Sequence, residues 1–281
     1  MKLGLGTVQI GLPYGVSNST GEVSIDEASS ILQRARAAGI RTIDTAAAYG
    51  DSESRLGQLG LDGFQVVSKV AGVKPDMLTD AVTASISRLR VDSLHGLLLH
   101  RASDLLGNDG GDVWRTLERL KADGLVEKIG VSVYRPEELD TLPHSIRPDL
   151  VQLPYNILDR RMETSGWLSR LKAMGVEIHA RSAFLQGLLL MEAESRPSRF
   201  SRWNTIWTIY EAWLAENNLT RLESCLGFAL ANPLLDRIIV GTQSASQLSQ
   251  LLAVEPLVTP VPVTLAVLDD DLINPANWNT K

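Results

Sequence analysis

Cysteine is nearly absent from this chain of 281 residues, since Cys225 is its only one. A single thiol excludes an intrachain disulfide and a metal centre built on several cysteines. Its apolar neighbours Leu226 and Phe228 predict that the thiol is buried. The sequence also contains no run of Lys and Arg, and its formal net charge is -6 with a pI of about 5.3. Nucleic acid is therefore an unexpected partner, because a phosphate backbone attracts basic proteins.

Long apolar runs are absent as well. No continuous apolar segment reaches the ~18 residues that cross a membrane, and the start Met1-Lys2-Leu3-Gly4 lacks the apolar stretch of a secretion signal. We therefore expect a cytoplasmic protein without a membrane partner. No cluster of histidines and carboxylates is spaced to bind a metal ion, so no metal site is predicted. The remaining expectation is a small-molecule partner, and the oligomeric state is left open.

What the chain does contain is a regular alternation of strand-like and helix-like segments. Apolar and β-branched runs predict eight strands, at residues 3–7, 42–44, 64–68, 94–99, 127–133, 150–155, 176–183 and 237–242. Most connections between them have room for only one helix, which favours right-handed crossovers between parallel strands. We predict an α/β fold, a single (β/α)8 TIM barrel over residues 1–281, with its active site at the C-terminal ends of the strands.

A doubly wound sheet is the alternative fold. Its dinucleotide-binding fingerprint is Gly-x-Gly-x-x-Gly after the first strand. Here Gly4 and Gly6 are followed next by Gly11, which is the wrong spacing. The barrel is therefore preferred. The longest insertion, between the last two strands, carries an aromatic stripe that predicts core packing, formed by Trp203, Trp207, Tyr210 and Leu214.

Four chemically useful side chains follow three successive predicted strands. Asp44 ends one strand, and Tyr49 follows it after a short turn of small residues. Lys69 and His100 end the next two strands. Because neighbouring strands lie roughly 4.8 Å apart, these groups are expected to meet. An ammonium makes a phenol a better proton donor near neutral pH, a carboxylate keeps the ammonium charged, and a neutral imidazole can orient a carbonyl oxygen.

Several segments resemble the aldo-keto reductases, and the resemblance covers almost the whole chain. They are Leu3-Gly4-Leu5-Gly6-Thr7, Thr42-Ile43-Asp44-Thr45-Ala46 with Tyr49-Gly50, Ser68-Lys69, Leu98-Leu99-His100 and Ile129-Gly130-Val131-Ser132. The resemblance implies that Asp44, Tyr49, Lys69 and His100 form the catalytic tetrad of that family. It implies an NAD(P)H-dependent enzyme that reduces an aldehyde or ketone, sugars and sugar-derived carbonyls included, to the alcohol, with Tyr49 as general acid.

The same resemblance implies a cofactor site across the carboxyl end of the barrel, for NADPH with NADH as the second candidate. Ser132 and Gln152 match the residues that hold the nicotinamide carboxamide, and the turn that begins at Gly241 matches the pyrophosphate and adenosine-ribose site. The full set of expected cofactor residues is Gly6, Thr7, Ser132, Gln152, Arg181, Ser182, Gly241, Thr242, Gln243 and Gln247.

Three departures from the family pattern limit how far the family's cofactor-binding roles can be assigned to these residues. Val133 follows Ser132 where many relatives have asparagine, and Arg181 stands where an aromatic side chain usually stacks on the nicotinamide. The last turn is neutral, with Gln243 and Gln247, so a preference for NADP over NAD is not implied. A guanidinium can stack on a ring, and we hypothesise that Arg181 weakens binding of the cationic oxidised nicotinamide. Pairing of Arg181 with a carboxylate is the alternative.

Substrate-binding residues are less specifically indicated. Candidates for the rim of the cleft are Tyr14, Arg101, Tyr155, Trp203 and Trp278, and the tail at 260–281 resembles the segment that shapes the pocket in relatives. Two other functions stay open. One is a lyase or aldolase that forms a Schiff base on Lys69, and the other is a non-catalytic cofactor-binding subunit of another protein.

Overall fold

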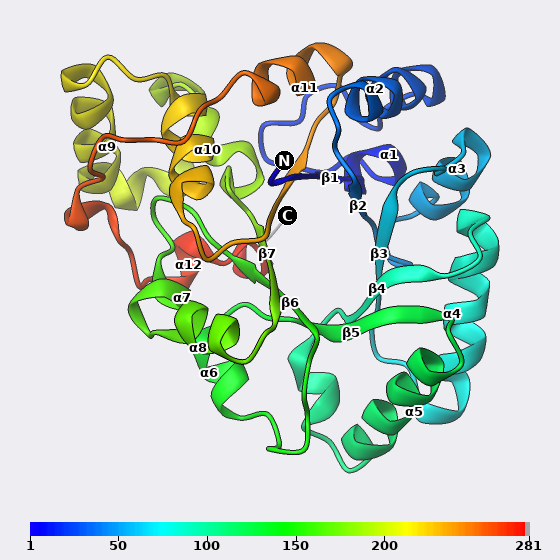
Figure 1. Ribbon diagram of the computed structural model, residues 1–281. Coiled ribbons are helices and arrows are strands. Elements are labelled where there is room, and N and C mark those ends of the chain that lie inside the picture. Colours follow the sequence, from blue (N-terminus) through cyan, green and yellow to red (C-terminus); the bar gives the residue numbers. More distant parts are fainter. Residues whose placement is uncertain (279–281) are drawn as a thin grey trace.

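A closed barrel of eight parallel strands forms the centre of the protein in the computed structural model, which describes residues 1–278 (Figure 1). Each strand pairs with the next in sequence, and β8 pairs with β1 to close the barrel. The strands are β1 (Leu3–Gly6), β2 (Thr42–Asp44), β3 (Gln65–Val70), β4 (Leu94–Leu99), β5 (Val126–Ser132), β6 (Leu150–Pro154), β7 (Glu177–Arg181) and β8 (Arg237–Gly241). The predicted (β/α)8 barrel is confirmed.

Helices surround the barrel and cover its outer face (Figure 1). The α-helices are α1 (Val8–Gly11), α2 (Ile25–Ala37), α3 (Ser52–Leu59), α4 (Pro75–Leu89), α5 (Gly110–Ala122), α6 (Pro136–Asp140), α7 (Arg161–Thr164), α8 (Trp167–Ala173), α9 (Asn204–Glu216), α10 (Arg221–Ala231), α11 (Ala245–Leu252) and α12 (Asp270–Ile273). Short 3-10 turns are η1 (Ala102–Leu105), η2 (Leu185–Leu190), η3 (Ala193–Ser195), η4 (Ser198–Trp203), η5 (Val263–Leu265) and η6 (Pro275–Asn277). Within residues 1–278, no helix has both the length and the apolar character needed to cross a membrane.

The local sequence explains where the elements begin and end. At the start of α2, the Ser24 side chain accepts a hydrogen bond from the Glu27 amide, which satisfies one free donor of the first turn. Gly39 follows α2 with φ +77, a left-handed conformation that favours glycine. Strand β7 ends at Arg181, two residues before the predicted end, because Ser182 has φ +61 and turns the chain away from the sheet.

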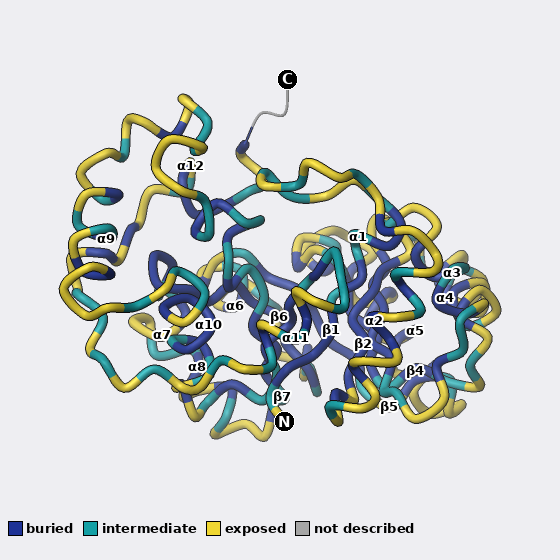
Figure 2. Tube along the Cα trace, turned by 90° about the horizontal axis from the view of Figure 1, so that it is seen from above, coloured by how far each residue is buried: buried dark blue, intermediate teal, exposed yellow. Residues whose placement is uncertain are grey.

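The barrel interior is stratified along its axis. Val67, Leu98 and Leu150 form a small apolar cluster of their own, apart from the larger core between strands and helices. Toward the amino ends of the strands, Glu177 pairs with Lys128 and accepts a hydrogen bond from the His179 ring. In a view turned by 90° from that of Figure 1, the strands in the middle are mostly buried and the outer parts of the helices on either side are exposed (Figure 2). The interior is therefore filled, and a ligand can enter only near a mouth.

The insertion between β7 and β8 adds a second apolar core beside the barrel. Trp207, Tyr210 and Leu214 of α9 are buried in it, which confirms the predicted core packing. Cys225 on α10 is also buried there, as predicted, and burial raises the pKa of its thiol to about 11. The described part of the tail packs on the same core through Leu265, Leu272, Ile273 and Trp278. Residues 279–281, the end of the predicted 260–281 tail, lie outside the described residues.

Candidate active site

The structure brings Asp44, Tyr49, Lys69 and His100 together at the carboxyl end of the barrel. Lys69 Nζ donates to Asp44 Oδ1 at 2.5 Å and to the Thr45 carbonyl at 2.9 Å. The same ammonium lies 5.1 Å from the centre of the Tyr49 ring. The Tyr49 and His100 rings meet edge to face, with centres 5.9 Å apart. A phenol therefore lies between a paired ammonium and an imidazole.

The charge states of this group follow from burial and pairing. Burial alone would lower the pKa of the Lys69 ammonium, but the charge and hydrogen bond of Asp44 outweigh burial and raise it. Burial, with the positive charges of Lys69 and Arg181, lowers the pKa of His100 to about 4. At neutral pH, Lys69 is therefore charged and His100 is neutral. A neutral imidazole can donate a hydrogen bond to an oxygen without adding a positive charge.

A close backbone contact fixes the turn that carries Tyr49. A Cβ built on Gly11 of α1 would lie 2.1 Å from the Tyr49 carbonyl oxygen, and one built on Gly50 would lie 2.2 Å from the Gly11 carbonyl. Gly50 also has φ +53. Only glycine at both positions allows this approach. The loop after β1 and the turn after β2 therefore hold each other in place.

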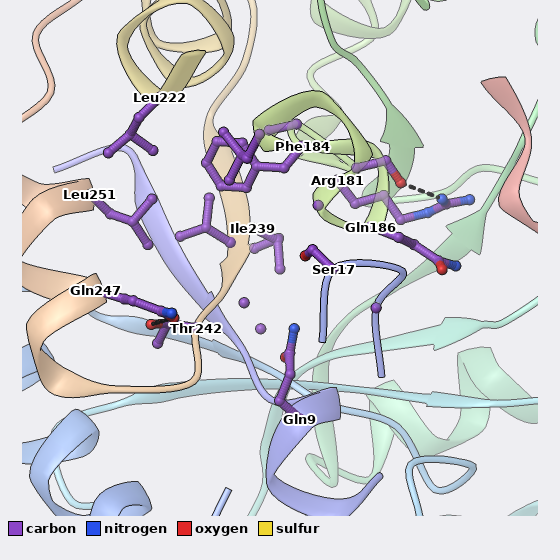
Figure 3. Close-up of a pocket in the computed structure, with 18 of the residues that line it drawn as sticks. Gln9, Ser17, Arg181, Phe184, Gln186, Leu222, Ile239, Thr242, Gln247 and Leu251 are labelled. Atoms are coloured by element: carbon purple, nitrogen blue, oxygen red, sulfur yellow. Dashed lines mark hydrogen bonds between the residues drawn. The ribbon is translucent and has the colours of Figure 1, made fainter. Parts of the chain in front are cut away.

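A cavity of about 830 Å³ opens over this group. Asp44, Tyr49 and His100 line one part of the cavity. Leu222 of α10 and Leu251 of α11 line another part of its wall (Figure 3). Nine of the ten residues expected to bind a cofactor line the cavity, namely Gly6, Thr7, Gln152, Arg181, Ser182, Gly241, Thr242, Gln243 and Gln247. Ser132 is buried at the end of β5, in register with Gln152.

Two loops meet across the cavity, a contact that the sequence did not indicate. The Gln186 side chain of η2 donates to the Tyr14 hydroxyl at 3.0 Å. The Gln186 carbonyl accepts from the Val16 amide, also at 3.0 Å. Gln186 has φ +55, which is uncommon for a residue with a side chain. Tyr14 thus lies on the cavity wall as expected, joined to the loop after β7.

Arg181 makes contacts that neither interpretation of the sequence anticipated. Its guanidinium lies 4.1 Å from the centre of the Tyr134 ring. It also donates to the Val133 carbonyl at 3.0 Å and to the Ser182 hydroxyl at 3.2 Å. A carbonyl, a hydroxyl and an aromatic ring thus take the place of the carboxylate that the alternative interpretation proposed. The signal that could have been noticed is Tyr134, one residue beyond the departure at Val133.

Gln152 joins the tetrad to the expected cofactor residues. Its side-chain amide donates to Asp44 Oδ2 at 2.7 Å, while Lys69 holds Oδ1. The Asp44 carboxylate is therefore held on both oxygens. This contact was not predicted, because the two residues are 108 positions apart in the chain.

Four predicted rim residues lie away from the cavity, and those predictions are corrected. Tyr155 is buried, stacked on Phe228, and its hydroxyl is bound by Asn232 and Glu163. Arg101 is exposed just before η1, and it is not among the residues that line the cavity. The tail anchors the other two. Trp203 donates to Asp269, and Trp278 packs on Phe200 and donates to the Leu272 carbonyl.

The wall of the cavity suits an elongated polar ligand. Gln9 Oε1 and Gln243 Nε2 are buried without a hydrogen-bond partner among the described residues, and both residues line the cavity. Unpaired buried polar atoms are costly, so each needs a partner that a ligand can supply. A Cβ on Gly241 would lie 2.5 Å from the Gln9 side chain, so glycine keeps this wall open. These residues fit the amide, hydroxyl and phosphate groups of a nicotinamide dinucleotide.

Comparison with known proteins decides the family. The model of the aldo/keto reductase family matches residues 2–260. The chain belongs to this family. Aldo/keto reductases are oxidoreductases that generally use nicotinamide cofactors, and the resemblance predicted from the sequence is confirmed.

Individual aldo/keto reductases agree with this assignment. The chain is 38% identical over 166 residues to an aldo-keto reductase of Mycobacterium sp. strain JLS, covering 56% of this chain and 58% of the relative. It is 30% identical over 175 residues to a glyoxal reductase of Bacillus subtilis, covering 59% and 61%. The matches thus span less than two thirds of these relatives. A solved aldo-keto reductase of Bacillus halodurans shares the fold, with a TM-score of 0.74, 20% identity and coverage of 91% and 88%.

Proposed function

We propose that this protein reduces an aldehyde or ketone to the alcohol, with a reduced nicotinamide dinucleotide as cofactor and Tyr49 as general acid. The observation that carries the proposal is the placement of Tyr49 between the Asp44–Lys69 ion pair and His100. Family membership supports the class of reaction. The unpaired polar atoms along the cavity support the binding of a dinucleotide.

Each residue of the tetrad has a distinct task in this reaction. A bound nicotinamide supplies the hydride. Tyr49 donates its proton to the carbonyl oxygen, and the Lys69 ammonium stabilises the negative charge that remains on the phenol. Asp44 keeps Lys69 charged, and Gln152 fixes the second oxygen of Asp44. Neutral His100 donates to the same carbonyl oxygen and orients it.

Other side chains would bind the cofactor and the substrate. Gln9 and Gln243 have free polar atoms for the dinucleotide, and Gln152 and Ser132 are the candidates for its carboxamide. The substrate would lie near Tyr49, where Tyr14 also lines the cavity. The Bacillus relative is named a glyoxal reductase. We therefore include small dicarbonyls, together with sugar-derived carbonyls, among the proposed substrates.

The Schiff-base alternative has less support. A lysine must be uncharged to attack a carbonyl. Lys69 is buried, paired with Asp44, and its pKa is raised. The non-catalytic alternative predicts dinucleotide binding without turnover of any carbonyl.

The test combines binding and turnover. NADH and NADPH are titrated by fluorescence, and oxidation of the bound form is then followed with glyoxal, simple aldehydes, ketones and keto-sugars. We expect Tyr49→Phe to lower turnover on the order of 100-fold or more without changing dinucleotide affinity. Tyr155→Phe is the matched control, because it removes a hydroxyl outside the cavity. Full turnover in Tyr49→Phe would contradict the proposal.

A further inference from the structure

The cavity extends from the tetrad to a region between α10 and α11. Leu222 and Leu251 line it there, with Gln247 close by (Figure 3). Two aliphatic side chains suit the faces of a planar base, and glutamines suit ribose hydroxyls. If the nicotinamide lies at Tyr49, as the proposed function requires, the adenosine half of the dinucleotide belongs here. The inference below rests on that function.

The amino end of α11 borders this region, and three amides in and just before its first turn are already occupied. The Gln243 amide donates to Gln247 Oε1 at 2.8 Å, and the Gln247 amide donates to the Ser244 hydroxyl at 3.1 Å. The Ala245 amide donates to Glu27 Oε1 at 2.7 Å. A helix amino end usually attracts anions through free amides. Here the protein supplies the acceptors itself, and one of them is a carboxylate.

Glu27 is held in this position by its own helix. It lies in the first turn of α2, where its amide donates to the Ser24 hydroxyl. A second contact between the helices, Arg34 Nε to Ser249 Oγ at 2.9 Å, fixes α2 beside α11. The Glu27 carboxylate therefore lies behind this end of the cavity, bound to the first residue of α11, and does not itself line the cavity.

Within residues 1–278, Glu27 makes no ion pair, and Arg34, two turns further along α2, donates to Ser249 instead. Gln243, Gln247 and Gln250, which line this part of the wall, are neutral. Among the described residues, the only Lys or Arg side chains that line the cavity are Arg181 and Arg221. Arg181 stacks on Tyr134, and Arg221 pairs with Glu192 and Glu211 at 2.7 and 2.6 Å. A phosphate at the adenosine ribose would lack the paired cation that such groups need.

We infer that the site selects NADH over NADPH, and that Glu27 enforces the selection. Its carboxylate is bound to the first amide of α11, next to the wall that Gln243 and Gln247 form, and it would repel the negative charge of a 2'-phosphate at that wall. NADH carries a neutral hydroxyl at this position. Glu27 is thus a specificity-determining residue on the second helix of the barrel.

The experiment is a fluorescence titration of wild type and Glu27→Gln with NADH and with NADPH, at low and at moderate salt. Wild type should bind NADH at least about tenfold more tightly than NADPH. Glu27→Gln keeps an oxygen for the Ala245 amide and removes only the charge. It should bind NADPH about tenfold more tightly than wild type does, with little change for NADH. Asp26→Asn, an exposed charge on the same helical turn, is the control and should change neither affinity.

The outcomes separate the two proposals. If wild type binds neither dinucleotide, the proposed function fails. If it binds NADPH as tightly as NADH, the function stands and this inference is overturned. If NADH is preferred but Glu27→Gln and Glu27→Ala leave the ratio unchanged, the role of Glu27 is overturned. A gain in NADPH affinity that shrinks with salt supports it, because salt screens charge repulsion.

Discussion

Within residues 1–278, Lys69 is the one cation that forms an ion pair with Asp44. Both side chains are almost completely buried. Lys69→Met would leave a buried carboxylate without its cation, which typically costs about 3–5 kcal/mol of unfolding free energy. Urea unfolding of the variant measures this loss. The double variant Lys69→Met with Asp44→Asn should recover part of the stability and none of the turnover. A single variant as stable as wild type would show that the ion pair is not needed for folding.

His100 gives the protein a specific pH dependence. Its pKa is about 4 in the folded protein and 6.5 ordinarily. Between these values the unfolded chain binds a proton that the folded protein does not, so acid favours unfolding. Stability contributed by His100 is present above pH 6.5 and falls as the pH drops toward 4, by up to roughly 3 kcal/mol.

The measurement is the unfolding free energy of wild type and His100→Gln at several pH values from 7 to 4.5. The difference between the two proteins isolates His100 from the carboxylates that titrate in the same range. The wild-type curve should fall more steeply. Parallel curves would mean that His100 is not held neutral by its surroundings.

Side-chain direction decided which site residues could be predicted. Asp44 ends β2, Lys69 is the next-to-last residue of β3 and His100 directly follows β4, so the strand-like runs predicted all three at one end of the barrel. Arg101 and Tyr155 were placed at the rim by sequence proximity alone, although one side chain points to solvent and the other is buried against Phe228. The hydrogen bond from Gln152 to Asp44 joins β6 to β2, which are distant in the chain, so no local sequence pattern could predict it.

At the scale of elements, the contact between α1 and the turn after β2 is the least tolerant feature near the site. Gly11→Ala would push a methyl group into the Tyr49 carbonyl and the Ser52 amide. The turn must shift, so we expect turnover to fall by about tenfold or more while dinucleotide affinity changes little. Thermal unfolding and steady-state kinetics measure both effects. Gly107→Ala, where no atom lies within 4 Å, is the matched control. Equal turnover in the two variants would contradict the role of this contact.

The regular elements followed from the sequence, but the loop after β7 did not. Apolar runs predicted the strands because each is buried on both faces. Ser182, Leu185 and Gln186 all have positive φ, a conformation that their residue types do not indicate. Hydrogen bonds with Tyr14 and Val16 help to hold that loop, and both residues lie far away in sequence, near the start of the chain.

At the scale of the molecule, the two mouths of the barrel have different roles, one in catalysis and the other in stability. The tetrad lies at one mouth, and at the other Glu177 contacts Lys128, His179 and His95. Burial would raise the pKa of Glu177, but its hydrogen bonds to these groups outweigh burial and lower it. Glu177→Gln should therefore cost roughly 3 kcal/mol of stability.

Dinucleotide affinity should not change in Glu177→Gln, because the cavity is at the opposite mouth. Chemical unfolding and fluorescence titration test the two statements. Glu127→Gln is the control, since this carboxylate also contacts His95 but is 63% exposed, and its loss should cost no more than about 1 kcal/mol. A large loss of affinity in Glu177→Gln would show that the two mouths are coupled.

The single thiol described above has a practical consequence for the whole chain. Cys225 is buried beside Tyr210 and Ser224, and only a thiolate reacts with alkylating reagents. While the second apolar core stays closed, such a reagent cannot reach it. The rate of alkylation therefore measures how often the α9–α10 region opens spontaneously, and Cys225 serves as the probe without any substitution.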